Sequence, residues 1–199
     1  MALKFEYDKD KRTATVCGVE GEDLYSEKIV IPKTVEYYKK EYLVTKIAGF
    51  RGLERLKSIT IPDSVTSIRE SAFSSCSSLT EFKGKYASAD GRCLIVNGVL
   101  TAVACGGVTK FTIPEGVTSI GESAFSVCRS LTSITIPAGV TSIGDLAFAD
   151  CSSLKTVKIC NEEGNVKIEE HAFPKGTCIE YIGKQEPKKK GFFARLFGK

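Results

Sequence analysis

The sequence predicts a strand-rich α+β solenoid in which coils of about 23 residues stack on one another. The first observation behind this prediction is a pattern of apolar residues, proline, Ala-Phe and cysteine that recurs at a fixed spacing. The second is that each unit contains short extended runs, which are typical of strands. The third is that a unit of this length cannot bury its own apolar edge, so neighbouring units must stack, about 5 Å apart.

The composition of the 199-residue chain, with 42% apolar and 26% charged residues, is that of a globular protein. It excludes a disordered chain and a small disulfide scaffold. No apolar run reaches the roughly 18 residues that a membrane helix needs, and the run from Met1 to Asp8 lacks the apolar segment of a secretory signal. We therefore expect a cytoplasmic protein.

The repeat is clearest between Leu131 and Leu154, where one unit ends and the next begins. Equivalent units begin at Leu56 and near Phe111, and degenerate copies flank them on both sides. At least five coils can be counted in this way.

Each unit contains three predicted elements. L-x-x-I-x-I-P predicts a short strand that ends at the proline, and V-x-x-I predicts a second extended piece. The segment with Ala124, Phe125 and Cys128 has the three-to-four spacing of a helical turn. We therefore expect a one-turn helix at each corner.

Both ends and one middle coil depart from the repeat. Residues 1–23 contain two alternating runs around a charged turn and predict a hairpin that caps the first coil. Residues 24–182 form the predicted solenoid, and residues 183–199 a basic tail. Phe111 follows Phe82 by 29 positions instead of 23, and Asn97-Gly98 separates two apolar runs. We expect a hairpin to replace the far side of this coil, within an insert at 83–110.

The pattern L-x-x-I-x-I-P-x-x-V-x-x-I-x-x-x-A-F-x-x-C resembles the BspA-like, or TpLRR, class of bacterial leucine-rich repeats over residues 24–182. The run from Phe5 to Val16 also resembles the opening hairpin of this class. The resemblance implies a leucine-rich-repeat solenoid that binds proteins without catalysing a reaction. Because the class has surface members, a cell-surface binding protein or adhesin is the alternative.

Four cysteines share one slot of the repeat. The slot is apolar in every copy, and we interpret it as core filling next to a column of phenylalanines. A metal or redox site is the alternative, because the coil spacing falls within the Cα range of disulfides; parallel side-chain vectors, however, are poor for bridging. The lack of C-x-x-C pairs and of a signal predicts reduced thiols, and we expect Cys178 to continue the column. The cysteine column is Cys76, Cys105, Cys128 and Cys151, and the phenylalanine column is Phe73, Phe125, Phe148 and Phe173.

The sequence does not indicate catalysis. No G-x-S-x-G, H-E-x-x-H or Walker motif occurs, and the single histidine, His171, lies in a variable slot where we expect it to be exposed. Residues 184–199 carry six basic groups and one acidic group, a net charge of +5, which leaves −1 on residues 1–183. A body without excess positive charge argues against nucleic-acid binding. We expect a protein partner, and no metal, cofactor or small-molecule substrate.

Outward strand positions carry mostly Ser, Thr and Lys, which predicts a polar binding face without aromatic anchors. The segment from Tyr37 to Tyr42 is an aromatic-rich candidate contact, or simply a hairpin turn. The two outward rows are Thr60, Lys83, Thr112, Thr135 and Lys158, and Ser58, Glu81, Lys110, Ser133 and Thr156.

The tail has the composition of a helix that lies in a membrane interface. On a helix its four large apolar residues share one face, which basic residues border, and this composition favours an anionic membrane. The tail also resembles the C-terminal membrane-targeting sequence of MinD-type ATPases. A solubilising tail, a helix in a partner's groove and a helix packed on the last coil are the alternatives. The candidate membrane-binding residues are Lys188, Lys189, Lys190, Phe192, Phe193, Arg195, Leu196 and Phe197.

Together these features predict a noncatalytic scaffold in the cytoplasm, held peripherally at the inner membrane face by its tail. The cell-surface alternative requires a signal upstream of Met1.

Overall fold

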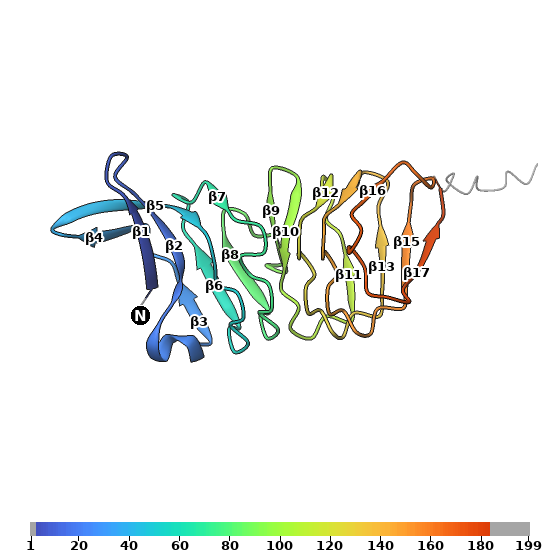
Figure 1. The fold of residues 1–199 in the computed structure, drawn as a ribbon, viewed down its shortest axis with the longest axis horizontal. Coiled ribbons are helices and arrows are strands. Elements are labelled where there is room, and N and C mark those ends of the chain that lie inside the picture. The colour runs from blue at the N-terminus through green and yellow to red at the C-terminus, as the bar shows by residue number, and fades with distance from the viewer. Residues whose placement is uncertain (1–2, 184–199) are drawn as a thin grey trace, which may run out of the picture.

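The computed structural model describes residues 3–183, which form a row of stacked coils that begins with an N-terminal hairpin (Figure 1). Within these residues the one helical element is the 3-10 helix η1 (Gly21–Tyr25). The strands are β1 (Leu3–Asp8), β2 (Thr13–Val19), β3 (Lys28–Val30), β4 (Thr34–Tyr37), β5 (Lys40–Ile47), β6 (Ser58–Ile61), β7 (Ser67–Ile68), β8 (Glu81–Gly84), β9 (Cys93–Val96), β10 (Val99–Val103), β11 (Lys110–Thr112), β12 (Ser119–Ile120), β13 (Ser133–Ile136), β14 (Ser142–Ile143), β15 (Thr156–Ile159), β16 (Lys167–Ile168) and β17 (Cys178–Tyr181).

The strands form two faces of the solenoid. The strand face consists of the sheets β3-β6-β8 and β11-β13-β15-β17. The second face consists of β1-β2-β5-β4, with β7 paired to β5, and of β16-β14-β12-β10-β9. Strands of successive coils pair in parallel, as β13 and β15 do, whereas β1/β2, β4/β5 and β9/β10 are antiparallel hairpins. The strand-rich solenoid that the sequence predicts is confirmed.

The 23-residue period is visible in the register between coils. Ile134 of β13 lies opposite Val157 of β15, 23 positions later. The hydroxyl of Thr141 donates to Thr118 O at 3.2 Å, also across 23 positions. Equivalent side chains therefore lie side by side, and small polar ones bond to the backbone of the preceding coil.

The corners are turns, and the prediction of a one-turn helix there is wrong. In the coil that contains Phe125, Ser123 and Val127 have φ angles of 55° and 61°, in the left-handed region. Two left-handed residues four positions apart interrupt an α-helix. The N–H of Val127 donates instead to Ala149 O of the next coil, at 2.8 Å. The corner thus forms a third line of hydrogen bonds between coils.

The apolar interior is divided into two clusters at the insert. One cluster begins at Ala14 and ends at Ala104, and the other runs from Cys93 to Ala172. The β9/β10 hairpin contributes Leu94 to the first cluster and Leu100 to the second. The two halves of the solenoid therefore share this hairpin.

The insert forms the predicted hairpin. Its turn residues Asn97 and Gly98 have φ angles of 52° and 79°. A two-residue turn with positive φ at both positions matches the twist of the flanking strands. Because β10 also pairs in parallel with β12, the hairpin takes the place of the second-face strand in this coil.

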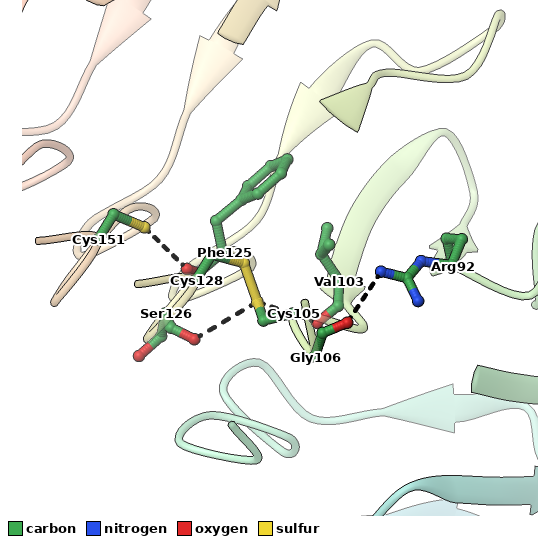
Figure 2. The surroundings of a disulfide bond; sticks show 8 residues. All are labelled: Arg92, Val103, Cys105, Gly106, Phe125, Ser126, Cys128 and Cys151. Atoms are coloured by element: carbon green, nitrogen blue, oxygen red, sulfur yellow. Dashed lines mark hydrogen bonds between the residues drawn. A yellow bond between two sulfur atoms is a disulfide. The ribbon is translucent and has the colours of Figure 1, made fainter. Parts of the chain in front are cut away.

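Arg92 joins the two halves of the solenoid. Its guanidinium donates from Nη1 to Thr80 O at 3.0 Å. It also donates from Nη2 to Gly106 O at 3.3 Å (Figure 2). The N–H of Gly106 in turn donates to Leu79 O at 2.7 Å. At this seam, side-chain bonds replace part of the strand pairing found between other coils.

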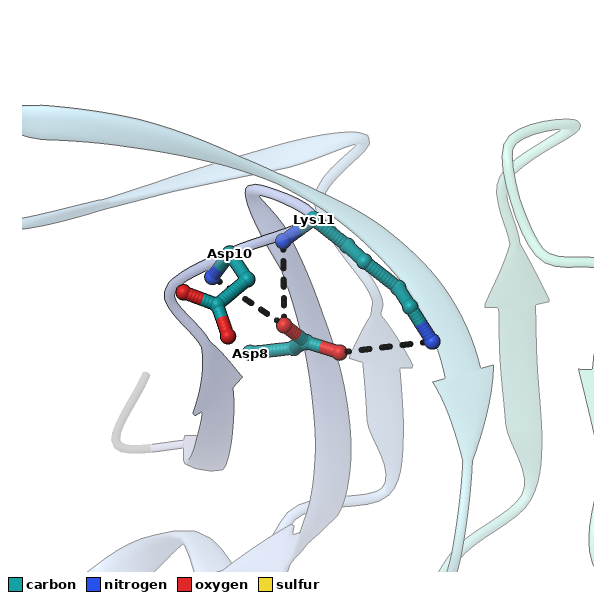
Figure 3. A network of polar contacts seen from close by, with 3 residues as sticks. All are labelled: Asp8, Asp10 and Lys11. Carbon is teal, nitrogen blue, oxygen red and sulfur yellow. Dashed lines mark hydrogen bonds and ion pairs between the residues drawn. The ribbon is translucent and has the colours of Figure 1, made fainter.

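The N-terminal hairpin has a charged turn that one carboxylate holds together. Asp8 Oδ1 accepts the backbone N–H groups of Asp10, at 3.2 Å, and Lys11, at 3.0 Å (Figure 3). Lys11 Nζ lies 3.8 Å from Asp8 Oδ2. Because β2 pairs in parallel with β5, the hairpin covers the edge of the first coil.

Candidate binding surface

The strand face presents the two outward rows in the order that the sequence predicts. Thr112, Thr135 and Lys158 lie side by side on β11, β13 and β15. The row ends at Glu180 on β17, whose carboxylate lies 3.9 Å from Lys158 Nζ. This pair is exposed, and exposed ion pairs contribute little. The face is therefore polar and close to neutral.

The strand face is interrupted beside a half-buried aromatic residue. β8 and β11 each pair on one side only, so the two sheets of this face do not join. A shallow depression of about 240 Å³ lies on β11 and β13 beside the break, and the half-buried Phe111 lines it. The Phe111 ring packs edge-on against Phe125, with centroids 5.2 Å apart. The other lining residues are Lys110, Thr112, Ser133, Ile134 and Thr135.

The N-terminal part carries a second aromatic group. Tyr37 and Tyr42 belong to the β4/β5 hairpin, and the ring of Tyr37 stacks on Tyr7 of β1 with centroids 4.2 Å apart. Tyr42 is buried, whereas Tyr38 at the turn is 80% exposed. The tyrosine segment is thus a hairpin turn, and its rings pack on the N-terminal hairpin. The contact between Tyr37 and Tyr7 was not predictable from the sequence, because it joins strands that are distant in the chain.

A larger depression, of about 620 Å³, lies at the corner beside the insert. Arg51, Arg69, Glu70 and Glu122 line it, and Ser71 Oγ donates to Glu122 Oε1 at 2.8 Å. Because its charges are of both signs, this depression does not select a ligand of one charge.

The four residues of the cysteine column are buried. Cys76 Sγ and Cys151 Sγ each donate to the carbonyl of a phenylalanine in the preceding coil, Phe50 and Phe125, both at 3.1 Å. Burial raises the pKa of the Cys76 thiol to about 11 and that of Cys151 to about 12. Both thiols are protonated at neutral pH, a form that is neither nucleophilic nor a metal ligand.

The expectation of reduced thiols is wrong for one pair. Cys105 and Cys128 form a disulfide between adjacent coils, with their Cα atoms 4.7 Å apart (Figure 2). Cys105 follows β10 of the insert rather than an Ala-Phe corner, and its Sγ lies 3.8 Å from Ser126 O of the next coil. Its side chain therefore departs from the parallel arrangement that disfavours bridging.

Cys178 does not continue the cysteine column. It lies in β17 opposite Thr156, in an outward row, and it is exposed. Only five positions separate Phe173 from Cys178, whereas eight separate Phe148 from Thr156. The shortened corner omits the cysteine slot and moves Cys178 onto the strand.

His171 is exposed, and its Nδ1 lies 3.3 Å from Asp145 Oδ1 in the preceding coil. Among residues 3–183, no group of three His, Cys, Asp or Glu side chains is placed to hold a metal ion. No helix in the same part of the chain is long and apolar enough to cross a bilayer. All the candidate membrane-binding residues, from Lys188 to Phe197, lie outside the described residues.

Solved structures with a similar fold are bacterial leucine-rich repeat proteins. One from Bacteroides ovatus is 26% identical, with a TM-score of 0.55, and the alignment covers 91% of this chain and 51% of that protein. The T. pallidum protein TpLRR is 20% identical, with a TM-score of 0.50, and coverage is 94% and 88%. A leucine rich cell surface protein from Faecalibacterium prausnitzii is 23% identical, with a TM-score of 0.48, and coverage is 93% and 54%. The chain thus spans about half the length of the B. ovatus protein.

No protein of curated function shows significant similarity to the chain. Six copies of the BspA type leucine rich repeat region match it, over residues 25–85 and 103–189. The gap between these ranges, residues 86–102, contains β9 and most of β10 of the insert hairpin. Leucine-rich repeat proteins of this kind are generally binding scaffolds. The chain belongs to the BspA-type leucine-rich repeat family.

Proposed function

We propose that this chain is a noncatalytic scaffold that binds a protein through its strand face and attaches peripherally to an anionic membrane through residues 184–199. The break between β8 and β11 carries the first part of the proposal. Here hydroxyl groups and one lysine line the depression, and Phe111, in an inward slot of β11, is half-buried beside the open edge of the sheet. Apolar centres with polar rims are the usual anatomy of protein interfaces.

The strand face is tested by quantitative affinity capture with paired baits. The double variant Thr112→Glu, Thr135→Glu places two carboxylates on the rim of the Phe111 depression, and Ser67→Glu places one on the exposed second face. We expect proteins enriched by the wild type to be lost with the first bait and kept with the second. Partners retained equally by both baits would contradict binding through the strand face.

The membrane proposal predicts binding to anionic vesicles that salt weakens. Phe193→Glu should abolish it, because a carboxylate in the apolar face cannot enter the interface. Each replacement of Lys188, Lys189 or Lys190 by Gln should weaken binding about fivefold, since each lysine near an anionic surface contributes about 1 kcal/mol. Sedimentation with phosphatidylglycerol vesicles measures both effects.

Ala194→Glu is the matched control for this prediction. It adds the same charge at a position that a helix would place outside the face of the four apolar residues, so binding should fall only by a step like that of one lysine. Equal binding to neutral and anionic vesicles would refute the proposal.

The cell-surface alternative is favoured by one observation. The Cys105–Cys128 disulfide joins two coils, and disulfides persist in oxidising compartments rather than in the cytosol. Rapid acid trapping and alkylation of cells, followed by mass spectrometry of these two cysteines, distinguishes the cell-surface hypothesis from the cytoplasmic one. An oxidised pair in intact cells supports the cell-surface hypothesis, and a reduced pair supports the cytoplasmic hypothesis.

Reduction of this disulfide should lower the free energy of unfolding by about 3 kcal/mol, because the bond closes a loop across 23 positions. Urea denaturation of the purified wild type, with and without a thiol reductant, measures the change. The variant Cys128→Ala should show no response to the reductant. A response of equal size in that variant would mean that the stabilisation comes from elsewhere.

A further inference from the structure

The last coil presents an open apolar end. Ile179 of β17 lies in register with Val157, which is fully buried, yet 37% of Ile179 is exposed. Phe173 is half-buried, whereas Phe148 of the preceding coil is fully buried. Tyr181 occupies an inward slot in β17 and is also half-buried. These side chains are exposed because no further coil among residues 3–183 covers them.

The other end of the solenoid is covered on its second face, whereas, among residues 3–183, β3 on the strand face pairs only with β6. There β2 pairs with β5, and β1 pairs with β2, so that charged side chains lie on the outermost strand. At the C-terminal end β17 pairs only with β15 within the described residues. An uncovered apolar edge with unpaired backbone groups favours the addition of another segment.

The segment that follows β17 is not suited to form another coil. In the preceding coil, the slot seven positions after Ile159 holds Val166, which is buried. The corresponding position after Tyr181 holds Lys188. Large apolar residues return only at Phe192, so a cover made from this segment would not follow the repeat.

We propose that residues 184–199 fold back over the open end of the last coil, with Phe192, Phe193, Leu196 and Phe197 against Ile179 and its neighbours. The eight residues between Gly183 and Phe192 span up to about 26 Å, and a four-residue strand such as β17 is about 13 Å long. The segment therefore reaches any part of the end. Its attachment one residue beyond Ile182 also gives it a high effective concentration there.

The distribution of charge also favours residues 184–199 as the segment that covers this end. Five exposed charges of the last coil have no ion-pair partner within residues 3–183: Glu162, Glu163, Glu170, Lys155 and Lys175. They leave an excess of one negative charge on this coil, whereas the tail carries a net charge of +5. A coil with excess negative charge attracts a basic segment with an apolar face more than it attracts a second copy of this body, whose net charge is also slightly negative.

The functional effect of this docking rests on the proposed function, because the same four apolar residues would also insert into the membrane. Docked on the last coil they are hidden from lipid, and bound to lipid they leave the coil open. The two positions compete, so the membrane has to displace the docked tail.

Hydrogen exchange of the full chain without lipid tests the docking. We expect the amides of β17 to exchange at least tenfold faster in Phe193→Glu than in the wild type, and those of β2 to exchange equally in both. Ala194→Glu should resemble the wild type. Equal exchange of β17 in the wild type and Phe193→Glu would overturn the proposal.

Cross-linking tests proximity within one chain. Ala194→Cys is paired with the exposed Cys178 in a chain where the partly exposed Cys17 and Cys160 are replaced by Ser. At low protein concentration a short bismaleimide should give an intramolecular product. A product that links two chains would mean that a second copy covers this end, and no product would mean that the tail lies elsewhere.

Ile179→Glu separates this inference from the membrane proposal, because it alters the docking end and leaves the tail sequence unchanged. We expect this variant to bind phosphatidylglycerol vesicles several-fold more tightly than the wild type. If docking is wrong, both proteins bind vesicles equally. If membrane attachment is wrong, neither binds, and the exchange difference of β17 remains.

Discussion

Replacing Phe148 with Ala should lower the free energy of unfolding by about 3 to 5 kcal/mol. Phe148 is fully buried, and its ring stacks between Phe125, 4.6 Å away, and Phe173, 5.0 Å away. The substitution removes contacts with both neighbouring coils and leaves a cavity that corner hydrogen bonds keep from collapsing. Urea denaturation followed by circular dichroism measures the loss.

Phe173→Ala is the matched comparison for Phe148. Phe173 has one ring neighbour in the column and is half-buried, so we expect clearly less destabilisation. Losses of equal size would mean that contacts on one side alone determine the stability of the phenylalanine column. That result would argue against stabilisation by stacking of successive coils.

Cys151→Asp should destabilise the protein by several kcal/mol at neutral pH, enough to unfold the neighbouring coils. The burial that raises the pKa of the Cys151 thiol to about 12 would also raise the pKa of a carboxyl placed there. A carboxyl with a raised folded-state pKa costs least below its unfolded value of about 3.9, and the cost grows as the pH rises. The difference in stability from Cys151→Ala should therefore be small at pH 3 and large at pH 7.

Two controls accompany this prediction. Cys151→Ala should cost only about 1 to 2 kcal/mol, because a small buried side chain is shortened without adding a charge. Cys178→Asp introduces the same carboxyl at an exposed position of β17 and should have little effect. Unchanged stability in Cys151→Asp would place that side chain at the surface and contradict the register of the coils.

The repeat period, the strands and the insert hairpin were predictable, because each depends on the types of residues within a short stretch of the sequence. Asn97-Gly98 indicates its turn by residue identity alone. The corners were not predictable in the same way, since their left-handed residues include Ser123, Val127 and Leu146, types that do not signal positive φ. Stacking of the coils imposes this conformation, and the sequence of one corner does not show it.

The candidate surface was predictable only in part. The outward rows followed from alternation within strands, but the exposure of Phe111 depends on a missing neighbour at the β8/β11 break. The Cys105–Cys128 disulfide depends on how the insert redirects one side chain. Both features arise where the repeat is interrupted, and there the alignment of equivalent positions no longer predicts which residues meet.

The seam at Arg92 also determines how the molecule responds to load. An elongated body bends most easily where the fewest bonds cross its section, and between β8 and β11 the strand pairing of this face is absent. Hydrogen bonds from Arg92 to Thr80 O and Gly106 O connect the two stiffer segments there. Under tension the segments should part at this joint first, where the β9/β10 hairpin contributes side chains to both apolar clusters. The strand face would then adjust its curvature as two rigid plates and not as one continuous surface.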